Sequence, residues 1–122
     1  QAARSGRAPG GRIIAVHQPH LYTRTRDHVD EFADVFSRLA DFTVVLDVFA
    51  AREQPIPGIT GAWVAEHFPD PTAVRAESDW DRAIADVVGR VRPHDIVLTL
   101  GGGDVNLLAP RIVAALQERT AA

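Results

Sequence analysis

The residues best suited to chemistry lie together in one segment of ten residues, His17-Gln18-Pro19-His20-Leu21-Tyr22-Thr23-Arg24-Thr25-Arg26. Arg24 presents a planar fork of N–H donors that matches a carboxylate or a phosphate. Further hydrogen-bond donors can come from the side chains of His20, Tyr22, Thr23 and Thr25. The segment therefore predicts an anion-binding site, and a solvated loop that binds nothing is the alternative.

A metal site in the same segment is a much weaker interpretation. His17 and His20 are spaced as a pair of ligands, but a zinc site needs three or four protein ligands. The chain contains no cysteine, and no cluster of acidic residues at ligand spacing accompanies the pair. We therefore expect this domain to hold no metal.

A glycine-rich turn, Gly101-Gly102-Gly103-Asp104, follows an apolar run and precedes a predicted helix. Backbone N–H groups at such a turn can bind phosphate. The dinucleotide-binding pattern needs a third glycine where Asn106 stands, and the chain has no lysine-containing phosphate loop. A tight turn that needs small residues for close packing is the favoured interpretation.

Four acidic residues stand near the ends of predicted strands, namely Asp41, Asp47, Glu53 and Asp95. Two convergent carboxylates would be able to carry acid–base chemistry. Their spacing selects no pair, so we expect caps, turns and solvated charges at these positions. We expect no catalytic residue in this segment.

The composition limits the classes of function. The chain has 122 residues, 46% apolar and 24% charged, which suits one globular domain. A net charge of −3 argues against broad nucleic-acid binding, which requires a basic face. No apolar run approaches the roughly 18 residues of a spanning helix, and no signal peptide is evident. We expect a cytoplasmic protein with no nucleic-acid or membrane partner.

Apolar runs alternate with amphipathic segments from residue 12 to residue 122, which predicts a single α/β domain. Residues 1–11 are rich in Gly, Ala and Arg and are expected to be a flexible lead-in or the end of an upstream helix. Strands are expected at residues 12–16, 43–48, 72–76 and 95–100, with helices between and after them. The order predicts three layers, with a mainly parallel sheet between helices on both faces.

Local signals predict where the helices begin. Thr25 or Asp27 is expected to cap the helix after the polar segment. A capping box over Ser78–Asp81 is expected to start a later helix, and Pro110 must lie in the first turn of the last helix or kink it. Ligands of parallel sheets bind beyond the carboxyl ends of the strands. Residues 17–25 and 101–104 both fall at that edge.

The segment His17–Thr25 resembles the signature F-Q-P-H-R-Y-T-R-T of UDP-N-acetylmuramate–L-alanine ligases, with seven of nine positions in agreement. Residues 46–53 resemble the same family's L-D-V-Y-x-A-x-E, and residues 101–104 are similar to its G-A-G-D turn. Order and spacing hold from about Arg12 to Leu116, nearly the whole chain. The variant at residues 51–55 is similar to actinobacterial members. The chain is identified as a member of this family, as its C-terminal domain.

The resemblance implies a Rossmann-like fold and a role as the amino-acid-binding and closing domain of an ATP-dependent ligase of peptidoglycan biosynthesis. In this family ATP phosphorylates the lactyl carboxylate of UDP-N-acetylmuramate, and the amine of L-alanine then attacks the acyl phosphate. The sugar nucleotide, ATP and Mg²⁺ bind mainly to other domains. This segment alone is therefore expected to be inactive and to bind no cofactor, with L-alanine and the central ATPase domain as partners.

The resemblance also implies roles for single residues. Arg24 is the residue expected to bind the carboxylate of L-alanine, and His20 is its expected neighbour in the pocket. The residues expected to shape the loop around them are Tyr22, Thr23 and Thr25.

Three departures from the family pattern stand out. Leu21 replaces an arginine that many members carry beside the pocket, so one anion contact is missing or supplied elsewhere. His17 replaces the usual phenylalanine, which we interpret as a change in packing. The family's D-D-Y-x-H-H-P segment is expected before residue 1, so the domain's first strand and helix lie outside this sequence.

Three alternatives stay open on the residues alone. One is a free-standing anion- or nucleotide-binding module. Another is a noncatalytic interaction domain with a decayed site, for which Leu21 is the hint. A related ligase that adds glycine or serine in place of L-alanine also fits the same pattern.

Overall fold

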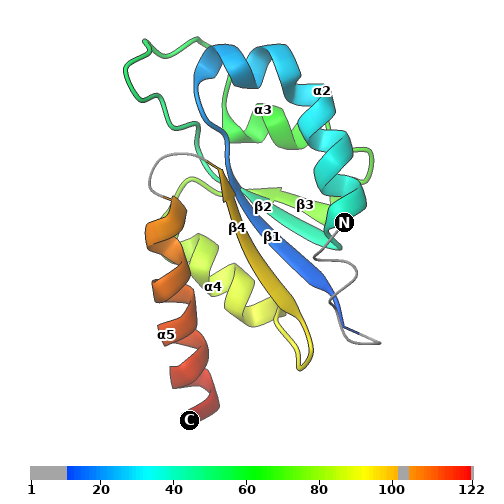
Figure 1. The fold of residues 1–122 in the computed structure, drawn as a ribbon, viewed down its shortest axis with the longest axis vertical. Helices are drawn as coiled ribbons and strands as arrows, with labels where there is room; N and C mark the ends of the chain where they lie inside the picture. The colour runs from blue at the N-terminus through cyan, green and yellow to red at the C-terminus, as the bar shows by residue number, and fades with distance from the viewer. Residues whose placement is uncertain (1–10, 102–104, 122) are drawn as a thin grey trace.

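The computed structural model describes residues 11–101 and 105–121, where the chain forms an α/β domain around one parallel sheet (Figure 1). The four strands are β1 Ile13–Gln18, β2 Phe42–Val45, β3 Val74–Ala76 and β4 Ile96–Gly101. They lie in the order β3-β2-β1-β4, and each neighbouring pair is parallel. The predicted parallel α/β class is therefore confirmed. The lead-in expected at residues 1–11 lies, apart from Gly11, outside the described residues.

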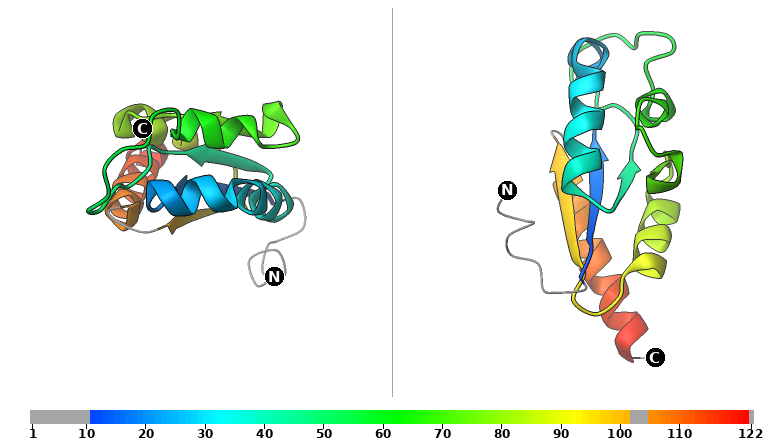
Figure 2. Two further views of the ribbon diagram at one scale, coloured as in Figure 1. Left: turned by 90° about the horizontal axis from the view of Figure 1, so that it is seen from above. Right: turned by 90° about the vertical axis from the view of Figure 1, so that its right-hand side faces the viewer.

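Helices cover both faces of the sheet. They are α2 Tyr22–Leu39, α3 Gly61–Glu66, α4 Trp80–Arg90 and α5 Leu108–Ala121, with short 3-10 turns at Pro71–Ala73 and Val105–Leu107. One face packs against α2 and α3, and the other against α4 and α5, which confirms the three layers. In Figure 2, α5 extends well beyond the sheet toward the C-terminus. No helix in the described part of the chain is long and apolar enough to cross a membrane.

Strand β1 is the centre of the core because both of its faces are covered. Ile13 and Ala15 pack toward α2 and α3, whereas Ile14 and Val16 pack toward α4 and α5. All six of its residues are buried, as an unalternating apolar run predicts. The same prediction was wrong for β4, whose side chains are only partly buried. The reason is that β4 lies at the edge of the described sheet and pairs with β1 alone.

Helix α2 begins earlier than the sequence predicts. It starts at Tyr22, so Tyr22 to Thr25 are helical and not part of a loop. The predicted cap from Thr25 or Asp27 was wrong, because the Thr25 hydroxyl instead donates to the carbonyl oxygen of Leu21 at 2.7 Å. The backbone departs from helical geometry at His28, with φ −125° and ψ 17°, so a short first segment precedes a kink.

Other boundaries shift by a few residues. β2 ends at Val45, not at residue 48, and β3 begins only at Val74, after a 3-10 turn. Asp79, not Ser78, caps α4, because its carboxylate accepts the N–H groups of Asp81 and Arg82 at 2.8 and 3.2 Å. Pro110 lies in the first turn of α5, as predicted.

Two of the acidic residues fasten the amino-terminal edge of the sheet. The Asp95 carboxylate, 1% exposed, pairs with the Arg12 guanidinium at 2.9 Å and accepts the backbone N–H groups of Arg12 and Arg92. Burial alone would raise the pKa of Asp95, but these hydrogen bonds outweigh it and lower the pKa. Asp41 accepts the N–H of Ile13 at 2.8 Å. Neither acid caps a helix: Asp41 binds the first residue of β1, and Asp95 is a buried ion-pair partner that also closes the turn before β4.

Candidate functional site: a pocket at the carboxyl ends of β1 and β4

A pocket of about 280 Å³ opens at the carboxyl ends of β1 and β4, the edge where the sequence predicts a ligand site. Its lining consists of His17, Gln18, His20, Arg24, Phe32 and Gly101. The volume suits a small ligand of amino-acid size. The pocket thus joins the end of β1, the first turns of α2 and the last residue of β4.

Arg24 supplies the positive charge of this pocket. It lies in the first turn of α2, and its side chain is exposed. Within the described residues it makes no ion pair, whereas the nearby Arg26 is paired with Asp27 at 2.9 Å. The guanidinium of Arg24 lines the pocket and has the planar geometry that a carboxylate requires.

His20 lies beside Arg24 in the pocket wall and is fixed by a second segment of chain. Its ring stacks on Phe49, with centroids 5.8 Å apart and planes inclined by 13°. The two residues also form an isolated parallel bridge, in which Leu21 donates to the Phe49 carbonyl and Phe49 to the Pro19 carbonyl, each at 2.8 Å. The loop after β2 therefore supports the pocket residue His20 through both backbone and ring.

His17 forms a buried, uncharged part of the wall. Its ring centroid lies 4.3 Å from that of Phe36 and 5.8 Å from that of Phe32. Burial lowers the pKa of His17 to about 4, although a contact of Nδ1 with the Leu100 carbonyl oxygen at 3.3 Å acts in the opposite direction. His17 is thus neutral at pH 7 and packs as an aromatic ring, in agreement with the packing interpretation.

The strand ends meet closely at Gln18 and Gly101. Gly101 has a φ of +136°, and a Cβ added there would lie 2.2 Å from the carbonyl oxygen of Gln18. Only glycine fits this approach, which confirms the need for a small residue at the start of the turn. The remainder of the predicted turn, residues 102–104, lies outside the described residues.

The first turn of α2 is held by a carboxylate from the loop after β2. Glu53 accepts the backbone N–H groups of Tyr22 and Thr23 at 2.5 and 3.1 Å, and the Thr23 hydroxyl at 2.5 Å. Thr23 therefore serves the helix start, and Thr25 is fully buried beneath it. Of the five predicted site residues, the structure places His20 and Arg24 in the pocket lining and the other three in the framework beside it.

Phe32 and Glu53 contribute to the site but lie outside the segment from which the site was predicted. Phe32 lines the pocket from the third turn of α2. Glu53 was expected to be a cap or a solvated charge, and nothing in the sequence says which helix it caps. Its position inside the second family-like segment was the available signal.

The chemistry of this pocket is that of binding. Among the described residues, no three His, Cys, Asp or Glu side chains gather to hold a metal ion. None of the lining residues that the structure describes carries a carboxylate. A cationic guanidinium beside a half-buried imidazole is suited to an anionic group such as a carboxylate.

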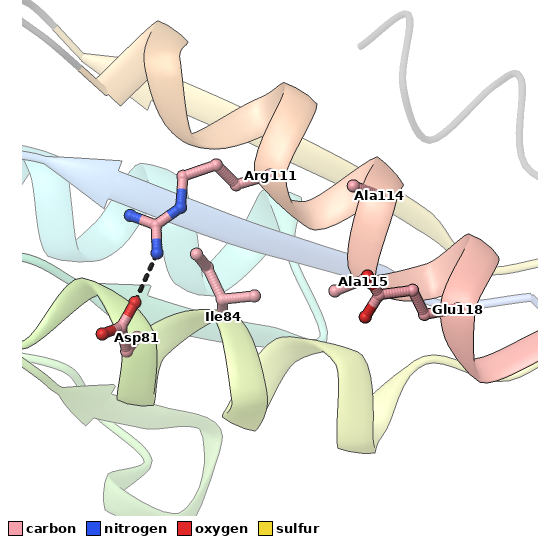
Figure 3. A pocket seen from close by; sticks show the side chains of 6 residues that line it. All are labelled: Asp81, Ile84, Arg111, Ala114, Ala115 and Glu118. Atoms are coloured by element: carbon pink, nitrogen blue, oxygen red, sulfur yellow. Dashed lines mark hydrogen bonds and ion pairs between the residues drawn. The ribbon is translucent and has the colours of Figure 1, made fainter.

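A second hollow, of about 270 Å³, lies between α4 and α5 (Figure 3). The guanidinium of Arg111 is paired across it with the carboxylate of Asp81, and Glu118 lies farther along α5. The side chains of Arg111 and Asp81 are 47% and 83% exposed. A surface pair of this kind contributes little to stability, roughly 0–1 kcal/mol, and the arrangement adds no chemistry.

Comparison with known proteins agrees with this architecture. The family model described as "Mur ligase, glutamate ligase domain" matches residues 1–103. The UDP-N-acetylmuramate–L-alanine ligase of Clavibacter michiganensis is 52% identical over 107 residues, which cover 88% of this chain and 22% of the relative. The enzyme of the same name from Mycobacterium sp. strain JLS is 49% identical over 112 residues, which cover 92% of this chain and 22% of the relative. The chain thus spans about a fifth of the length of these curated relatives.

A solved structure shares the fold. It is a domain assigned to a UDP-N-acetylmuramate:L-alanyl-γ-D-glutamyl-meso-diaminopimelate ligase of Haemophilus ducreyi. The TM-score is 0.59 at 23% identity, over 87% of this chain and 69% of that one. The parallel sheet with helices on both faces defines an α/β domain with a pocket at one edge of the sheet. The chain belongs to the Mur ligase family, as its C-terminal domain, and its close relatives include actinobacterial L-alanine ligases.

Proposed function

We propose that this domain binds L-alanine in the pocket at the ends of β1 and β4 and presents it for ligation to UDP-N-acetylmuramate. Arg24 binds the carboxylate of the amino acid, and His20 forms the adjoining wall. The observation that carries the proposal is the exposed guanidinium of Arg24 within that pocket, which makes no ion pair with any residue that the structure describes. The relatives named as L-alanine ligases, at about half identity, support the choice of amino acid.

The rest of the reaction belongs to other domains of a longer, cytoplasmic enzyme. There, ATP with Mg²⁺ activates the lactyl carboxylate of the sugar nucleotide, and the amine of L-alanine attacks it. A fixed guanidinium orients that amine, because holding one end of a small molecule limits the directions of the other. Closure of this domain over the ATP-binding domain would exclude water from the acyl phosphate.

The experiment is a chimera in which this chain replaces the matching segment of the Clavibacter michiganensis ligase. Phosphate release from ATP is measured with UDP-N-acetylmuramate present and with L-alanine, glycine or L-serine added in turn. We expect release that depends on L-alanine and is much weaker with the other two amino acids. Equal release with and without an amino acid would contradict the proposal, and a preference for glycine or serine would correct the substrate.

A further inference from the structure

The first turn of α2 has no cap of its own. The first N–H groups of a helix need acceptors from outside it, most often the side chain of the preceding residue. That residue is Leu21, which has no acceptor and has a φ of 66°, a value that leucine rarely adopts. The acceptor comes from Glu53 instead, thirty-one positions along the chain from Tyr22.

Glu53 suits this place both in charge and in geometry. Its Oε1 accepts from the N–H groups of Tyr22 and Thr23, and its Oε2 accepts from the hydroxyl of Thr23. The hydrogen bond from the Thr23 hydroxyl, together with those from the two N–H groups, lowers the pKa of Glu53. An ionised carboxylate at the N-terminus of a helix also interacts favourably with the helix dipole.

The turn held by Glu53 is separated from the rest of α2. The non-helical backbone at His28 divides the helix, so the residues before it form a short segment of their own. Arg24 lies in that segment, between the two N–H groups that Glu53 accepts and the kink. A helical segment this short is only marginally stable unless other parts of the protein contact it. The direction of the Arg24 side chain therefore depends on what holds the segment.

We propose that Glu53 is a positioning residue for the amino-acid site, whose carboxylate fixes the helical turn that carries Arg24. Glu53 does not line the pocket, and it acts on the ligand only through Arg24. This inference rests on the proposed function, because it concerns how the carboxylate of L-alanine is held.

The test compares Glu53→Ala and Glu53→Gln in the same chimera, each with and without Arg24→Ala. We expect Glu53→Ala to raise the KM for L-alanine about tenfold and to leave the KM for ATP within about twofold. Glu53→Gln keeps an oxygen for the two N–H groups, so we expect a rise of less than about threefold. In the Arg24→Ala background, Glu53→Ala should cause almost no further rise in the KM for L-alanine, because Glu53 acts on the ligand only through the Arg24 side chain.

Glu31→Ala is the matched control, since Glu31 lies on the same helix and its one ion pair within the described part of the chain is with His28 at 3.1 Å. Thr23→Val removes one of the three contacts with Glu53 and should also raise the KM for L-alanine. This variant tests the same proposal if Glu53→Ala does not fold.

Independent effects of Glu53→Ala and Arg24→Ala on the KM for L-alanine, or an equal rise in the KM for ATP, would overturn the positioning role. If Arg24→Ala alone leaves the KM for L-alanine unchanged, the proposed function fails. A raised KM in Arg24→Ala with an unchanged KM in Glu53→Ala defeats this inference only.

Discussion

The rings of His20 and Phe49 stack nearly parallel, with ring centroids 5.8 Å apart and an interplanar angle of 13°. The contact fastens a pocket residue to the loop after β2, together with the backbone bridge between the same two residues. Phe49→Ala should release the imidazole and weaken L-alanine binding by about 1 kcal/mol, the scale of an aromatic pair. Phe49→Tyr keeps the ring and should bind as the unchanged protein does. The KM for L-alanine is measured for each variant in the chimera. Equal KM values for Phe49→Ala and Phe49→Tyr would show that the stacked ring does not support the site.

His17 makes the stability of the fold depend on pH. Its pKa is about 4 in the folded chain, below its ordinary value of 6.5. Between these two pH values the imidazole is protonated in the unfolded chain but neutral in the folded chain. The stabilising effect is complete above about pH 6.5 and is lost as the pH falls toward 4. Between pH 7 and pH 4.5 we expect a loss of about 2–3 kcal/mol in the free energy of unfolding.

His17→Phe removes this titration and keeps an aromatic ring beside Phe32 and Phe36. Urea unfolding of the chain with histidine and with phenylalanine, at both pH values, isolates the contribution of this one group. The difference in stability between the two proteins should grow as the pH falls. A difference that stays constant from pH 7 to pH 4.5 would show that the pKa of His17 is not lowered.

Gly101 is the residue of the pocket that tolerates substitution least. In Gly101→Ala the new Cβ would meet the carbonyl oxygen of Gln18 at a backbone φ of +136°. Parting β1 from β4 at this point should cost about 2–4 kcal/mol in the free energy of unfolding. Gly89→Ala is the matched control, because Gly89 lies in α4 with nothing within 4 Å of an added Cβ. That change should stabilise the chain by about 0.5–1 kcal/mol. Thermal unfolding measures the stability of both variants. A Gly101→Ala variant as stable as the unchanged protein would contradict the close approach of β1 and β4.

The sequence predicts the layers of this fold because its buried strands are short, unalternating apolar runs such as Ile13 to Val16. It predicts the position of the pocket because parallel strands present their carboxyl ends at one edge. It fails at the start of α2, since the cap is Glu53 and no local pattern relates that residue to Tyr22. It also overstates the burial of β4, because an edge strand and a central strand have the same apolar composition. The motif supplied His20 and Arg24, whereas Phe32 entered the pocket through tertiary packing alone.

Arg24 is the residue on which the proposed function depends most directly. The decisive measurement is the steady-state kinetics of Arg24→Ala in the chimera with L-alanine varied, beside Arg26→Ala as a control. Arg26 lies two residues farther along the same helix, outside the pocket, and is paired with Asp27. We expect Arg24→Ala to lower kcat/KM for L-alanine by about 30-fold, or about 2 kcal/mol for a lost charged hydrogen bond, with the KM for ATP nearly unchanged. Arg26→Ala should have almost no effect. Unchanged kinetics for L-alanine in Arg24→Ala would mean that this guanidinium faces only solvent, and the pocket at the ends of β1 and β4 would not be the amino-acid site.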